Sequence, residues 1–106
     1  MNQQYQGDVS IIKIEKTDSR VSFLPLPKEG FVVAEGEVTG HKHTIVADRE
    51  SSIEIAKDEN GYFLKINAGK AIITHQQHAP ITIEQGLYFV GRQWEYDEIQ
   101  ERRVQD

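Results

Sequence analysis

Short apolar runs separated by turn residues extend along almost the whole chain, and they limit the folds it can adopt. Ile, Val and aromatic residues are concentrated in segments of four to nine residues bounded by Gly, Pro, Asn and Asp, as is typical of strands. Asn60-Gly61 gives the strongest hairpin signal. Long helical periodicity is missing throughout the sequence. We therefore predict an all-β fold, either a compact barrel or a jelly-roll-like sandwich of about eight to ten short antiparallel strands.

The expected strands follow one another at close spacing. They cover residues 8–16, 21–24, 31–34, 43–47, 52–57, 62–67, 70–75, 81–84 and 87–94. Gly36 and Gly40 favour a bend or bulge between the third and fourth strands. A length of 106 residues fits one domain over residues 1–106, with a polar N-terminal segment (1–7) and a polar C-terminal tail (97–106).

Composition and charge exclude several classes of function. The formal net charge is -5, and Lys and Arg form no dense cluster, which argues against nucleic acid as a partner. The chain has no cysteine, so disulfides and thiolate metal ligands are excluded. The polar N-terminus lacks the features of a signal peptide, and no apolar run reaches the ~20 residues of a membrane helix. We expect a soluble, cytoplasmic protein without a membrane partner.

All four histidines of the chain occur in two close pairs, His41 with His43 and His75 with His78. Residues i and i+2 of a strand share a face, so the first pair can reach one ion together. The second pair can converge with it if His75 ends a strand and His78 lies in the following loop. Neutral imidazole is the commonest protein ligand for transition metals. The pattern predicts a divalent metal site for Zn, Ni, Fe, Mn or Cu, with three or four imidazole ligands.

Two other interpretations of the histidines stay open. They could line a polar pocket without metal, or they could be unrelated surface residues. If a metal binds, acidic side chains near it in sequence could be ligands, could orient an imidazole or could act as general base. The acidic candidates are Glu35, Glu37, Glu84 and Glu95, and we name Glu37 and Glu95 as catalytic candidates.

The last predicted strand carries a second group of candidate residues. Its large polar and aromatic side chains are of the types enriched at binding hot spots, and we assign them to a ligand or protein interface: Arg92, Gln93, Trp94 and Tyr96. A core strand in which Arg92 stacks on an aromatic ring is the favoured alternative. Pairing of residues 87–94 across a homo-oligomer is a further expectation.

Motifs spread over residues 36–96 resemble a group of small bacterial proteins of uncharacterised function. The shared pattern consists of Gly36-Glu37-Val38-Thr39-Gly40-His41-x-His43, His75-x-x-His78-x-Pro80-Ile81, Gly86-x-Tyr88 and Arg92-Gln93-x-Glu95-Tyr96. Gln85 stands where that pattern has proline. The His41-x-His43 segment alone also resembles the metal-binding strand of cupins. The later Pro-x-Gly that precedes the last cupin histidine is missing here, because Pro80 follows both His75 and His78.

Two functional hypotheses result. The first is a small binding or structural module whose histidines form a metal or small-ligand pocket. The alternative is a cupin-like metalloenzyme with three histidine ligands, an open coordination position and Glu37 or Glu95 as general base. We favour the first, because no recognisable motif supplies an acid or a base.

Overall fold

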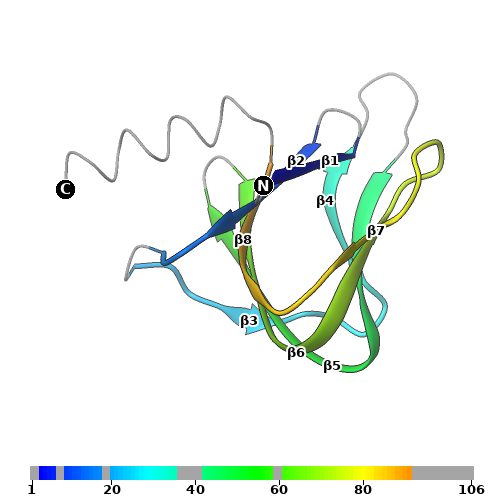
Figure 1. Cartoon of the computed structure of the whole chain (residues 1–106). Helices are drawn as coiled ribbons and strands as arrows, with labels where there is room; N and C mark the ends of the chain where they lie inside the picture. The colour runs from blue at the N-terminus through cyan, green and yellow to red at the C-terminus, as the bar shows by residue number, and fades with distance from the viewer. Residues whose placement is uncertain (1–2, 7–8, 18–19, 36–41, 59–60, 92–106) are drawn as a thin grey trace.

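Eight strands make up the regular structure of the described residues. Figure 1 shows the computed structural model, which describes residues 3–6, 9–17, 20–35, 42–58 and 61–91. The strands are β1 (Gln3–Gln6), β2 (Val9–Ile14), β3 (Leu24–Pro25), β4 (Phe31–Glu35), β5 (Lys42–Asp58), β6 (Gly61–Thr74), β7 (Ile81–Ile83) and β8 (Gly86–Gly91). Every pairing among them is antiparallel. The all-β prediction is confirmed. Within these ranges no helix has the length and apolarity needed to cross a bilayer.

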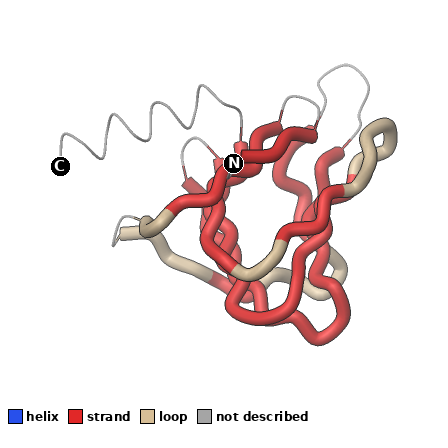
Figure 2. The backbone as a smooth tube through the Cα atoms, viewed as in Figure 1, coloured by secondary structure: helices blue, strands red, loops and turns tan. Residues whose placement is uncertain are grey.

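The strands form one sheet that curls around its core without closing into a barrel (Figure 2). The order is β1-β2-β8-β6-β5-β3, and β4 and β7 add to the other halves of β5 and β6. Sequence analysis predicted a closed barrel or two packed sheets. The described strands instead leave an opening, because β1 and β3, at the two ends of the strand order, do not pair with each other. Along one edge of β6, β8 pairs with its first half and β7 with its second half.

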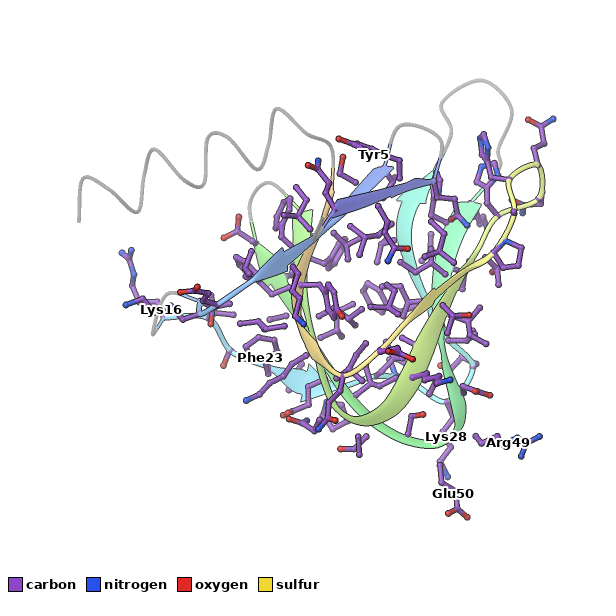
Figure 3. The ribbon with its side chains drawn as sticks, viewed as in Figure 1. Tyr5, Lys16, Phe23, Lys28, Arg49 and Glu50 are labelled. Carbon is purple, nitrogen blue, oxygen red and sulfur yellow. The ribbon has the colours of Figure 1, made fainter. Side chains whose placement is uncertain are left out.

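The two longest strands run through segments that sequence analysis divided in two. β5 and β6 stay paired from Thr44 opposite Thr74 to Asp58 opposite Gly61, with register shifts around Asp48–Ser52. Arg49 has a φ of 54° and Gly69, on the facing strand, a φ of 80°. A bulge of this kind bends a strand without ending it. Figure 3 shows Arg49 and Glu50 projecting away from the sheet at this bend.

The main core fills the concave side of the curled sheet (Figure 3). Its fully buried members come from five strands, and they include Ile11, Ile45, Leu64, Ile73 and Val90. A smaller cluster of Ala56, Phe63 and Phe89 lies apart from this core, and the Phe63 and Phe89 rings meet edge to face at 5.6 Å. Ile14, Val21 and Phe23 pack against the smaller cluster. Consecutive residues of β6 and β8 are therefore buried, which weakens the alternation that marks a strand.

The glycine of the Asn60-Gly61 pair has a role that differs from the predicted one. The β5–β6 hairpin forms where it was predicted, but Gly61 is the first residue of β6 and pairs with Asp58. Its φ is not positive. A Cβ atom at this position would lie 2.7 Å from both Cζ of Phe89 and the carbonyl oxygen of Val90. The close approach of β8 to β6 therefore favours a residue without a side chain at position 61.

Candidate histidine site

Strand register brings histidines from the two pairs to the same end of the sheet. His43 is the second residue of β5, and His75 directly follows the last residue of β6. Thr44 pairs with Thr74, so each histidine lies one residue beyond the final β5–β6 pair. His78 lies in the loop between β6 and β7, drawn in yellow in Figure 1. Pairing of β5 with β6 therefore brings together histidines that are far apart in the sequence.

The three described imidazoles form a row that leads from the interior to solvent. The ring centroids of His43 and His75 are 4.4 Å apart with 39° between the planes. Those of His75 and His78 are 4.6 Å apart with 46° between the planes. His43 is buried, with 4% of its surface exposed, whereas His75 is partly buried and His78 is exposed. We call His43, His75 and His78 the histidine row.

Gln6 fixes the orientation of the innermost ring. Its Nε2 donates to the backbone carbonyls of Ile73 and Ala79, each at 2.9 Å. Its Oε1 lies 2.9 Å from Nδ1 of His43. Both amide protons are used by carbonyl acceptors, so Oε1 must accept, and Nδ1 of His43 must donate. In the neutral ring the lone pair is then on Nε2. Sequence analysis missed Gln6, because an isolated glutamine in a polar N-terminal segment carries no local signal.

His75 has the opposite tautomer when it is neutral. The backbone N–H of Gln77 donates to Nδ1 of His75 at 3.0 Å, so this nitrogen carries the lone pair and the proton is on Nε2. The same loop is tied to the start of β5 by a 2.8 Å hydrogen bond from the N–H of Lys42 to Oε1 of Gln76. Two adjacent rings of the row thus present different nitrogens as acceptors.

The row as it stands is not a preformed metal cage. Among the residues that the structure describes, no three His, Asp or Glu side chains are arranged to hold a metal ion. Metal binding stays a prediction.

Several predicted site residues cannot be placed relative to the row. Outside the described residues lie His41, Glu37, Arg92, Gln93, Trp94, Glu95 and Tyr96. Glu35 ends β4, but its side chain is not described. Glu84 is exposed just after β7 and lies 3.9 Å from Nζ of Lys70.

Comparison with protein families assigns the chain to one of them. A family model described as "Domain of unknown function (DUF8820)" matches residues 5–93. The chain belongs to this family. The DUF8820 match spans both histidine pairs and includes Gln6, so the whole histidine row falls within the family domain. No curated protein and no solved structure matches the chain. The cupin resemblance of the His41-x-His43 segment has no support in these comparisons.

Proposed function

We propose that this domain is a binding module that holds a divalent transition-metal ion at the histidine row, with Nε2 of His43 as the anchoring ligand. One observation carries the proposal, the hydrogen bond from Nδ1 of His43 to the immobilised amide of Gln6. Histidines that bind metals through one ring nitrogen almost always donate the other N–H to a fixed acceptor, which sets the tautomer and the ring orientation. A buried imidazole held in this way is prepared to act as a ligand.

The outer ligands come from the loop that follows β6. His78 is exposed at the end of the row, and its ring can turn toward an ion near His43. If His75 binds through Nε2, the ring proton moves to Nδ1, and if it binds through Nδ1 the ion occupies that nitrogen, so either route breaks the hydrogen bond from Gln77. Metal binding is therefore coupled to a rearrangement of residues 75–80. His41 is the candidate fourth ligand, and an imidazole-only set suits Zn, Cu, Fe and Ni.

The test is a calorimetric titration of tag-free protein with zinc chloride and nickel chloride. We expect one ion per chain and a rise in unfolding free energy of roughly 2.7 kcal/mol when free metal is one hundred times the dissociation constant. His78→Ala removes an exposed ligand without disturbing the core, and it should weaken binding by roughly tenfold or more. Gln77→Ala is the matched control in the same loop, because its exposed side chain takes no part in the row.

Two results would refute the metal site. One is the absence of both binding heat and stabilisation with either ion. The other is unchanged affinity in His78→Ala and in His43→Asn, provided that amide spectra show both variants to be folded. The metalloenzyme alternative stays a prediction, because its candidate bases Glu37 and Glu95 lie outside the described residues.

A further inference from the structure

A second candidate site lies at the opening of the sheet, on residues separate from the histidine row. A hollow of about 620 Å³ is lined by residues of β1, β2, β6, β7 and β8 and of the turn between β7 and β8. Pockets for small ligands occupy roughly 300–1,000 Å³. The lining residues are Gln4, Ile11, Lys13, Lys70, Thr82, Glu84 and Tyr88.

The hollow combines a small apolar floor with two lysines from different strands. Ile11 and Tyr88 form this floor, and because only 1% and 8% of their surfaces are exposed, its small apolar surface comes mostly from Tyr88. Lys13 pairs directly with Tyr88 across β2 and β8, so their side chains share a face of the sheet. Lys70, from β6, is a second lysine of the lining. A chain with a net charge of -5 thus places two lysines, from β2 and β6, around one hollow.

Gly86 allows the close packing that holds Lys13 in this position. A Cβ atom on Gly86 would lie 3.2 Å from Cε of Lys13 and 3.3 Å from the Tyr88 ring and hydroxyl. The Cε atom of Lys13 therefore lies close to Gly86 and beside Tyr88. This contact restrains the end of an otherwise exposed side chain, which lowers the entropic cost of binding an anion.

The negative charge in the hollow is small. Among the described residues that line the hollow, Glu84 is the single acidic one, and it lies 3.9 Å from Lys70, with both side chains more than half exposed. Such exposed pairs are weak, so an incoming anion can compete for Lys70. The hydroxyl of Tyr88 donates to the backbone carbonyl of Glu84 at 2.9 Å. Burial and the Glu84 carboxylate raise the pKa of Tyr88, so its ring adds no charge near neutral pH.

From this arrangement we infer that the hollow binds a small organic anion, a carboxylate or phosphate ester with an apolar body. The acidic group lies near Lys13 and Lys70, and the apolar body lies against the Tyr88 ring. Thr82 and Gln4 supply polar groups at the rim. This site shares no residue with the histidine row, so either site can be present without the other.

Phenyl phosphate is a suitable probe, because it joins an anion to an aromatic ring. We expect its titration into the full-length chain to shift amide NMR signals of β2, of the β7–β8 turn and of Tyr88. Inorganic phosphate, which lacks the ring, and phenol, which lacks the charge, should bind more weakly. Lys13→Met and Lys70→Met retain the alkyl stems and should each weaken phenyl phosphate binding roughly threefold, as expected for one exposed charge pair.

Two further variants extend the test, one expected to tighten binding and the other to leave it unchanged. Glu84→Gln removes the competing carboxylate and should tighten binding, whereas Lys57→Met removes an exposed lysine of β5 outside the hollow and should leave binding unchanged. The inference is overturned if phenyl phosphate fails to shift these signals at millimolar concentration. It is also overturned if Lys13→Met and Lys57→Met bind equally well, or if phenol binds as tightly as phenyl phosphate.

Discussion

Gln6 and His43, 37 residues apart in the chain, share a buried 2.9 Å hydrogen bond that connects the first strand to the histidine row. The same amide also holds the carbonyls of Ile73 and Ala79. One side chain therefore joins β1, β5, the end of β6 and the following loop. This contact spans the side of the sheet where the strands do not pair, and it orients the ring on which the proposed function depends.

Replacing Gln6 should destabilise the domain and release His43. In Gln6→Ala the carbonyls of Ile73 and Ala79 and Nδ1 of His43 lose a buried partner, so we expect unfolding free energy to fall by about 2 to 4 kcal/mol. Urea denaturation measures this change. Gln4→Ala, at an exposed position of the same strand, is the control and should stay within ~0.5 kcal/mol of wild type. Equal stabilities of the two variants would contradict the role given to Gln6.

The two neighbouring imidazoles should have different tautomers in solution. Long-range ¹⁵N–¹H correlation spectra of metal-free protein at mildly alkaline pH should show the proton on Nδ1 in His43 and on Nε2 in His75. The reason is that Oε1 of Gln6 accepts from the first ring, whereas the N–H of Gln77 donates to the second. His78→Ala should leave the His43 assignment unchanged. Finding both rings as Nε2–H would show that Gln6 does not hold His43 as described.

Gly69 should tolerate no side chain. Its φ of 80° is strained for other residues, and a Cβ atom would overlap the side chain and Cα of Ser51. Ser51 cannot move easily, because its hydroxyl donates to the carbonyl of Asp48 and accepts from the N–H of Lys70. We expect Gly69→Ala to lower the thermal unfolding free energy by about 1 to 3 kcal/mol. Ala68→Gly, at the neighbouring exposed position, should lower the unfolding free energy by at most about 1 kcal/mol. A larger loss in Ala68→Gly than in Gly69→Ala would contradict this account of the bend.

Stability should decline at high pH because of Tyr88. Burial, followed by the Glu84 carboxylate, raises the pKa of Tyr88 above 10.0 in the folded state. Protonated Tyr88 makes its full contribution to the unfolding free energy below the pKa of the unfolded state. The contribution is lost as pH rises from that value through the pKa of the folded state, because the unfolded chain releases the tyrosine proton first. Urea denaturation between neutral pH and about pH 11 should show this decline.

Tyr88→Phe should flatten that pH dependence while lowering stability near neutral pH by about 1 kcal/mol, since the bond to the carbonyl of Glu84 is lost. Tyr5, whose side chain is 58% exposed, provides the control, and Tyr5→Phe should keep the wild-type slope. If Tyr88→Phe retains the full decline, another group is responsible for it.

Sequence patterns predicted the strands better than their connections. Strand β2 falls within a predicted segment, and β8 overlaps another from Leu87 to Gly91, because β-branched and aromatic residues mark both. The continuity of β5 through Arg49 was not predictable, because a bulge and the end of a strand have the same polar, turn-like sequence. The missing closure was equally hidden, since it depends on whether β1 and β3, the end strands of the sheet, pair with each other.

The histidine pairs were visible in the sequence, but the residues that organise them were not. His43 and His75 drew attention because histidine is uncommon and binds metals. Gln6 and the hollow beside Lys13 arise from long-range register alone. No spacing rule connects residue 6 with residue 43, or Lys13 on β2 with Lys70 on β6. Only the fold brings these side chains together.

Anomalous X-ray diffraction from crystals of tag-free protein grown with zinc chloride, measured on both sides of the zinc absorption edge, is the most direct test of the central claim. We predict an anomalous peak about 2.0 to 2.1 Å from Nε2 of His43, with His78 turned toward it and the His43–Gln6 hydrogen bond intact. A peak bound elsewhere, or no peak with His43 still stacked on His75, would contradict the proposed function.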